Sequence, residues 1–248
     1  MWLKGMTAVC AVAMLAGCSI NGVLVDKTPA AVERPTLVVH RVEADFEVDG
    51  KGSAPQWEKA EWVDLKAIRG PATYSTRVKT LYSGNGIYFL FDCEDALLTS
   101  TITEHYGALY SEDVVEVFLW PEESQRVYFE YEISPLNYEL PIMVVKGNGI
   151  FQGWRPWHYE GENKIRRATA VRGGEMKSGA EVEGWSTEFF IPFVLLRGLR
   201  NIPPVSGTRW RANMYRIDYD EPATFWVWSH LDAVNFHMID QFGTLVFE

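Results

Sequence analysis

Short runs of β-branched and aromatic residues recur along the chain and are separated by turns rich in Gly, Pro, Asn and Asp. Because helical periodicity is weak throughout, this alternation predicts an all-β fold. We expect strands in eleven segments: residues 36–42, 74–82, 87–92, 113–120, 126–133, 141–146, 165–172, 182–191, 208–218, 225–229 and 243–247. The sequences SGNG at 83–86 and PEES at 121–124 predict hairpins between the strands that they join.

The predicted domain extends over residues 36–248, and a length of about 210 residues fits one sandwich or barrel. We expect a single β-sandwich, jelly-roll or immunoglobulin-like, with long aromatic loops and at most one or two short helical turns. A helical turn is expected after Pro192, since proline is favoured at the first helical position. Residues 147–157 are rich in Gly and aromatic residues and are expected to form an irregular loop.

Aromatic residues make up 14% of the chain. Large side chains are needed to fill the space between two sheets, so we place four tryptophans in the core: Trp57, Trp62, Trp185 and Trp210. Rings in polar or Gly-rich segments are expected at the surface or around a site: Tyr106, Tyr110, Phe151, Trp154, Trp157, Tyr159 and Phe236. Such rings suit the apolar C–H faces of a sugar, and they would also suit a protein interface.

The segment SEDVVEVFLW at 111–120 places a carboxylate, Glu116, in an otherwise apolar strand. An isolated carboxylate in an apolar layer costs on the order of several kcal/mol unless it is paired or protonated. In the strand-like segment at 208–218, Arg216 enters an apolar row in the same way. Two interpretations of Glu116 stay open: a ligand-binding group, or half of a buried pair with Arg209, Arg211 or Arg216.

The N-terminal sequence MWLKGMTAVCAVAMLAGC has the layout of a secretory signal peptide, with one Lys followed by a short apolar stretch. Its last four residues, LAGC, resemble a bacterial lipobox, in which the cysteine is lipidated and becomes the first mature residue. We therefore expect a signal peptide at 1–17, a lipid anchor at Cys18 and a flexible tether at 18–35. Ser19 after the cysteine favours the outer membrane as the location within a bacterial cell envelope.

Charge and composition exclude several classes of protein. The net charge of −10 argues against nucleic-acid binding, which requires a basic surface. Once the signal is removed and Cys18 is lipidated, Cys93 is the one remaining thiol, so neither a disulfide nor a cysteine-based zinc site is expected. The five histidines are scattered without metal-ligand spacing.

Four segments, in order, resemble family 9 carbohydrate-binding modules. They are DFEVDGKGSAPQWEKAEW, TRVKTLYSGNGIYFLFDCED, YSEDVVEVFLW, and the C-terminal GTRWRANMYRID with WVWS and NFHMIDQFGTLVF. The resemblance implies a β-sandwich that binds an oligo- or polysaccharide without catalysis and acts beside glycoside hydrolases in carbohydrate catabolism.

By position, the resemblance implies that two rings, Tyr110 and Phe236, grip the glycan, with Asn235 beside Phe236. Glu116 matches the strand carboxylate that hydrogen-bonds sugar hydroxyls, and Arg216 would complete a polar floor. Both gripping rings are Trp in the family pattern, so smaller rings here imply a different ligand or weaker binding. Trp154 and Trp157 are further candidates for the carbohydrate site.

Three other functions remain open. A glycoside hydrolase would need two carboxylates in a cleft, and its candidates are Asp113, Glu116, Glu130, Glu132 and Glu188. The alternation in RVYFEYEIS, however, favours Glu130 and Glu132 as the solvated face of a strand. A haem-binding sandwich would use Met214, His230 or His237, and an envelope interaction scaffold would use the aromatic loops to bind a protein partner.

No cofactor is expected, with structural calcium as the one plausible exception. The acidic turn Asp92, Glu94, Asp95 could bring oxygen ligands together, and family modules often carry calcium. A solvated acidic turn is the competing interpretation.

Overall fold

The computed structural model describes residues 33–147, 150–156 and 160–248, with side chains for 33–146 and 160–248. The chain divides into two units, Met1–Glu33 and Arg34–Glu248, and the second contains the secondary structure described below. In the described residues, no helix is long and apolar enough to cross a membrane. The expected features that fall on residues 1–32, namely the signal peptide, Cys18 and most of the tether, lie outside the described residues.

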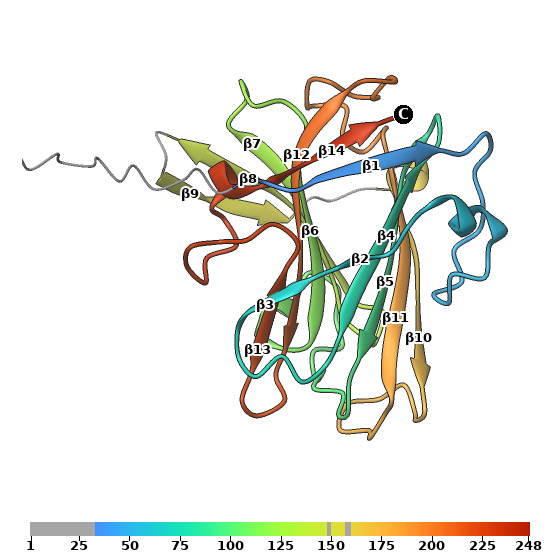
Figure 1. Cartoon of the computed structure of the whole chain (residues 1–248), viewed down its shortest axis with the longest axis vertical. Coiled ribbons are helices and arrows are strands. Elements are labelled where there is room, and N and C mark those ends of the chain that lie inside the picture. The colour runs from blue at the N-terminus through green and yellow to red at the C-terminus, as the bar shows by residue number, and fades with distance from the viewer. Residues whose placement is uncertain (1–32, 148–149, 157–159) are drawn as a thin grey trace, which may run out of the picture. The chain divides into compact units, whose positions relative to one another are not determined.

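Two sheets make up the second unit (Figure 1). The first sheet has the order β10 (Arg166–Arg172), β11 (Gly184–Pro192), β5 (Gly86–Glu94) and β4 (Thr76–Tyr82), with β2 (Val63–Asp64) paired to β4. The second has the order β14 (Gly243–Phe247), β12 (Arg209–Asp218), β6 (Val114–Trp120), β7 (Val127–Ile133), β8 (Glu139–Gly147) and β9 (Ile150–Pro156). Beside β12 lie β13 (Thr224–Val227) and then β3 (Lys66–Arg69). Strand β1 (Thr36–Arg41) pairs in parallel with β14 and with β4, and so joins the two sheets.

The main core lies between the sheets and follows from side-chain alternation. The inward residues of β6 are Val115, Val117 and Leu119, and they share one buried cluster with Phe89 and Phe91 of β5. Trp185 and Trp210 are also in this cluster, as expected, whereas Trp57 packs in a separate cluster and Trp62 is only half-buried. Because inward side chains of both sheets fill one common layer, the predicted β-sandwich is confirmed.

Each sheet also has a covered outer face. On the first sheet, a segment containing the short helix η1 (Pro55–Lys59) covers a cluster with Tyr88 and Phe190. Glu188 of β11 anchors this cover, because its carboxylate accepts hydrogen bonds from the Asp49 and Gly50 amides at 2.8 and 3.1 Å and from Trp57 Nε1 at 2.8 Å. On the second sheet, the outer residues of β6, β7, β8 and β12 form another buried cluster, which contains Phe118, Tyr128 and Tyr215.

All eleven expected strands are present, and both expected hairpins join the predicted strands. The helical content of the described residues is limited to η1, η2 (Leu109–Ser111), η3 (Gly161–Asn163) and η4 (Ile239–Gln241), all of 3-10 type; the residues after Pro192 form turns. The prediction of an irregular loop at 147–157 was wrong, because Ile150–Pro156 forms β9 against β8. Strand β9 lies at the edge of the sheet, where its Gly and Pro are tolerated.

Candidate functional site

A pocket of about 420 Å³ opens on the outer face of the second sheet. Its floor comes from four strands, which contribute Glu116 and Phe118 (β6), Glu130 and Glu132 (β7), Ile142 (β8) and Ile217 (β12). Its rim comes from three separate segments. The helix η2 contributes Tyr110, and the segment from the end of β12 into β13 contributes Tyr219 and Phe225. The loop before η4 contributes Val234, Asn235, Phe236 and His237. The pocket therefore depends on the association of segments that are far apart in the sequence.

Three glutamates meet on the pocket floor because of strand register. Glu116 of β6 lies directly opposite Glu132 of β7, and Glu130 lies two residues further along the same face of β7. Their exposed fractions are only 2%, 4% and 1% for Glu116, Glu130 and Glu132. One buried oxygen of each residue, Glu116 Oε1, Glu130 Oε2 and Glu132 Oε2, accepts no hydrogen bond from the described residues. Like charges directly opposite one another destabilise a sheet, so this arrangement costs stability.

Burial and mutual repulsion raise the pKa of all three carboxyl groups. Burial is the main cause of the raised pKa of Glu116, and the charge of Glu132 adds to it. Burial also raises the pKa of Glu130, with the charge of Glu116 second, and the pKa of Glu132, with the charge of Glu130 second. Burial and then Lys146 lower the pKa of His237 to about 4, so this imidazole is neutral at pH 7. The carboxyl groups of the floor therefore retain protons at pH values where solvated glutamates are ionised.

The rim supplies aromatic rings that are held by other parts of the protein. Phe236 stacks on Tyr215, with ring centroids 4.0 Å apart and planes at 7°, and the Tyr215 hydroxyl donates to the Phe236 carbonyl at 2.8 Å. The Tyr219 hydroxyl donates to the Tyr110 carbonyl at 3.0 Å. Tyr110 itself is 45% exposed, so nearly half of its surface is open to a ligand.

The structure brings four of the predicted site residues together. Tyr110, Glu116, Asn235 and Phe236 all line the pocket, although 126 positions separate the first from the last in the sequence. Trp154 belongs to β9, but its side chain is outside the described residues, as is all of Trp157.

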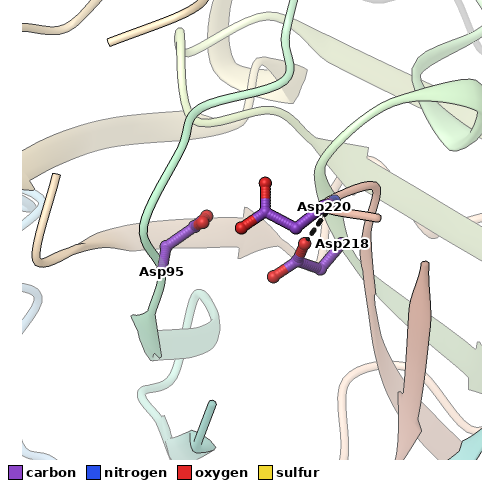
Figure 2. Close-up of side chains that lie close together, drawn as sticks. All are labelled: Asp95, Asp218 and Asp220. Carbon is purple, nitrogen blue, oxygen red and sulfur yellow. Dashed lines mark hydrogen bonds between the residues drawn. The ribbon is translucent and has the colours of Figure 1, made fainter. Parts of the chain in front are cut away.

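The predicted calcium ligands do not lie together. Asp92 forms ion pairs with Arg77 at 2.8 Å and Arg172 at 2.6 Å, and Glu94 accepts from the Ser75 amide at 2.9 Å. Asp95 instead faces Asp218 and Asp220 (Figure 2), with one carboxylate oxygen of each within 4.8 Å of the others. Among the described residues, this is the one group of three that has metal-like spacing. Calcium binding stays a prediction, and it is restricted to this group.

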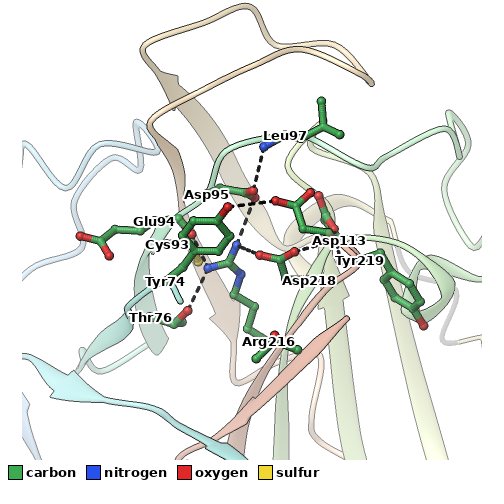
Figure 3. Close-up of polar contacts among 12 residues, drawn as sticks. Tyr74, Thr76, Cys93, Glu94, Asp95, Leu97, Asp113, Arg216, Asp218 and Tyr219 are labelled. Atoms are coloured by element: carbon green, nitrogen blue, oxygen red, sulfur yellow. Dashed lines mark hydrogen bonds and ion pairs between the residues drawn. The ribbon is translucent and has the colours of Figure 1, made fainter. Parts of the chain in front are cut away.

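Arg216 lies on the inward face of β12 among Asp95, Asp218 and Thr76 (Figure 3). Glu116 lies on the other side of the sheet, since it is opposite Tyr215, the neighbour of Arg216. The Nη2 of Arg216 contacts Asp218 Oδ2 at 2.7 Å and Asp95 Oδ2 at 3.1 Å, and its Nη1 donates to Thr76 Oγ1 and the Glu94 carbonyl at 3.1 and 2.6 Å. A Glu116–Arg216 pair, one of the open alternatives, is therefore absent, and the prediction that Arg216 belongs to the carbohydrate site was wrong, because the two side chains leave their strands in opposite directions. The guanidinium already forms ion pairs with Asp95 and Asp218, and its charge disfavours a calcium ion between the same carboxylates.

Other residues named in the alternative functions are separated by the fold. Met214 lies in the inter-sheet core, while His237 stacks against Phe118 on the outer face, so no haem-binding pair forms between them. Glu188 anchors the cover of the first sheet. Asp113 accepts hydrogen bonds from the Thr99 and Tyr219 amides at 2.6 and 2.8 Å and so ties two loops together.

Sequence reasoning missed most of the pocket. The prediction that Glu130 and Glu132 form a solvated strand face was wrong, because the outer face of β7 lies under the loops that carry Tyr110 and Phe236. One signal was available: the predicted hairpin after Trp120 limits the register of β7 on β6 and so favours a glutamate opposite Glu116. Nothing in the sequence indicated that Tyr219 and Phe225 would join the same rim.

The second unit is therefore a β-sandwich with an open pocket that has carboxyl groups on its floor and aromatic rings around its rim. The chain belongs to the carbohydrate family 9 binding domain-like family, whose model matches residues 48–248. No curated protein gives a significant match.

Solved structures share the fold at low identity. A candidate carbohydrate-binding protein from Bacteroides uniformis superposes with a TM-score of 0.74 and 18% identity, covering 87% of this chain and all of that one. A family 9 carbohydrate-binding module from Caldicellulosiruptor kristjanssonii in complex with cellotriose gives a TM-score of 0.63, 14% identity and coverage of 86% and 94%. The glucose complex of a family 9 module from the same organism superposes with a TM-score of 0.61 and 14% identity, and the match covers 85% of this chain and 95% of that one.

Proposed function

We propose that this domain binds a saccharide, without catalysis, in the pocket formed by Tyr110, Glu116, Glu130, Glu132 and Phe236. The observation that carries the proposal is that an aromatic rim and three buried carboxyl oxygens meet in one open pocket of about 420 Å³. These oxygens accept no hydrogen bond from the described residues. A volume of several hundred Å³ is typical of small-molecule sites and leaves room for one or a few sugar units.

The chemistry of the lining suits a sugar. Rings at the rim can stack on the apolar C–H faces of a pyranose, while the carboxyl oxygens on the floor can accept hydrogen bonds from its hydroxyls. One face of the Phe236 ring is already covered by Tyr215, so a ligand can stack only on the other face or meet the edge. Tyr110 is the more exposed ring and would make the larger contact. Cellotriose and glucose, bound by the Caldicellulosiruptor module, are the first ligands to test.

The cellular setting of the proposal rests on the N-terminal sequence. Lipidation at Cys18 would attach the domain to the bacterial envelope, at the outer membrane, through the tether at 18–35. A glycan-binding domain held there would retain polysaccharide near glycoside hydrolases and so support carbohydrate catabolism.

One observation favours a second function. Buried carboxyl groups with raised pKa values, gathered in a pocket, are also what a glycoside hydrolase requires. Membership of a family of binding modules favours binding alone. Release of reducing sugar from cello-oligosaccharides by the purified protein, abolished by Glu116→Gln, would establish catalysis instead.

The test of the binding proposal is calorimetric titration of the Cys18→Ser protein, which cannot be lipidated, with cellotriose and a panel of neutral and charged oligosaccharides. The proposal is supported if a saccharide gives a heat of binding with the Cys18→Ser protein, and if that heat is lost in the Tyr110→Ala and Glu116→Gln variants while their melting temperatures are retained. The matched control is Glu58→Gln, an exposed carboxylate on η1 at the other sheet. Absence of heat with every saccharide would favour the envelope scaffold, whose partner is a protein.

A further inference from the structure

The pocket has an unbalanced charge. Among the described residues, thirteen line the pocket, and they include three glutamates and no Lys or Arg. His237 lines the pocket, with its Nδ1 3.8 Å from Glu130 Oε2. Two other basic residues contact the rim: Lys146 donates from Nζ to the His237 carbonyl at 2.7 Å, and the Arg69 guanidinium lies 5.3 Å from the centroid of the Phe225 ring. Neither lines the pocket, and His237 is neutral at pH 7.

The other buried carboxylates of this domain are paired with a basic side chain or accept hydrogen bonds from N–H groups. Asp95 and Asp218 share the guanidinium of Arg216, and Glu139 pairs with Arg167 at 2.9 Å. Asp113 and Glu188 accept two and three N–H donors respectively.

Glu116, Glu130 and Glu132 are different, because each keeps a buried oxygen with no hydrogen-bond donor among the described residues. The fold brings three acidic groups together on the pocket floor, and no Lys or Arg of the described residues pairs with them. Protonation relieves part of the cost of burying them, and a cation supplied by a ligand would stabilise their ionised forms.

We propose that the ligand is a cationic saccharide, an amino sugar whose protonated ammonium group is held by Glu116, Glu130 and Glu132. This inference rests on the proposed function and narrows it to a ligand class. A neutral sugar can donate hydroxyl hydrogen bonds to the three carboxyl groups but cannot offset their charge. An ammonium group does both, because it offers three N–H donors and one positive charge.

Two further features favour an organic cation over a metal ion. The three glutamates do not meet the close spacing of ligand oxygens that Asp95, Asp218 and Asp220 meet among the described residues. The rim residues Tyr110, Phe225 and Phe236 are aromatic, and the face of an aromatic ring attracts ammonium groups and stacks on sugars, whereas a hard metal ion prefers oxygen ligands.

The experiment compares three trisaccharides with the same β-1,4 linkage, titrated calorimetrically into the Cys18→Ser protein at low and high salt. They are the glucosamine trimer, which is cationic, its fully N-acetylated form, which is neutral, and cellotriose. We expect the glucosamine trimer to bind at least tenfold more tightly than either neutral sugar at low salt, with an advantage that shrinks as salt is added.

Variants separate the pocket from general attraction to an acidic protein. Glu132→Gln should reduce the advantage of the glucosamine trimer about tenfold, and the exposed Glu58→Gln should leave it unchanged. Equal effects of the two variants would overturn the inference, since the attraction would then be non-specific. Tighter binding of cellotriose than of the glucosamine trimer would overturn it while leaving the proposed function intact. If none of the trisaccharides binds, the proposed function fails as well.

Discussion

Replacing Arg216 with Met tests whether this residue holds the sandwich together or takes part in the pocket. The guanidinium is fully buried, pairs with Asp95 and Asp218, and donates to Thr76 and the Glu94 carbonyl. Met keeps much of the apolar stem but leaves both aspartates without their counter-charge. Removing one partner of a buried ion pair costs about 3–5 kcal/mol. For a domain of this size, that loss lowers the melting temperature by roughly 6–20 °C.

The penalty should depend on pH in a defined direction. Burial raises the pKa of Asp95 to about 6, even with Arg216 beside it, so this pair is already weakened at pH 5. In the variant, loss of the positive charge raises the folded-state pKa of Asp95 further. Its protonated form is then favoured by folding, and stability falls as pH rises above the pKa of the unfolded chain. The loss caused by Arg216→Met should therefore be larger at pH 8 than at pH 5.

Thermal unfolding followed by circular dichroism at both pH values measures the effect, with Arg209→Met as the matched control. Arg209 is an exposed residue of the same strand, and its replacement should change stability by less than about 0.5 kcal/mol. Saccharide affinity of the folded Arg216→Met protein should stay within about twofold of that of the parent, because the side chain is on the inward face. The reasoning is refuted if the variant unfolds like the parent, or if it folds normally and loses saccharide binding.

Four further predictions concern the pocket, the buried Asp113 and the anchor. Glu132→Gln should raise the free energy of unfolding at pH 8 by about 1–3 kcal/mol, since it removes a buried carboxylate opposite Glu116. The gain should shrink towards pH 5, where the carboxyl group of the parent protein is protonated. A gain that is independent of pH would contradict this reasoning. The parent protein should itself become less stable between pH 5 and pH 8 in denaturant titrations, because burial raises the pKa of Asp113 to about 8 and folding therefore favours its protonated form. Tyr110→Ala should weaken saccharide binding about tenfold with a change in melting temperature below about 2 °C, since nearly half of the residue is exposed. A large loss of stability would show that the ring has a packing role. Cys18→Ser should move the protein from the membrane fraction to the aqueous fraction of expressing cells; continued membrane association would contradict lipid anchoring at this residue.

Local patterns predicted much of this domain correctly. The eleven strands and the two hairpins follow from β-branched and aromatic runs bounded by turn residues, because those signals act over only a few neighbours. Strand β9 was missed because its Gly and Pro argue against a strand unless it lies at a sheet edge, and edge positions are not visible in the sequence.

The positions of Glu116 and Arg216 show what sequence patterns cannot predict. Alternation shows correctly which neighbours within one strand share a face with each of them. It does not show which face of β12 aligns with which face of β6, since both faces of β6 are apolar around Glu116. That choice depends on register, which sets Tyr215 opposite Glu116 and turns Arg216 towards Asp95 and Asp218.

By itself, the sequence determined an all-β chain, the positions of its strands and turns, and the presence of a carboxylate that a simple apolar strand would not carry. Only the tertiary structure decided that this carboxylate meets Glu130 and Glu132 beneath Tyr110 and Phe236. The physical reason is that a strand's own side chains set its pleat, whereas its neighbours are selected by the packing of the whole sandwich, which no short segment encodes.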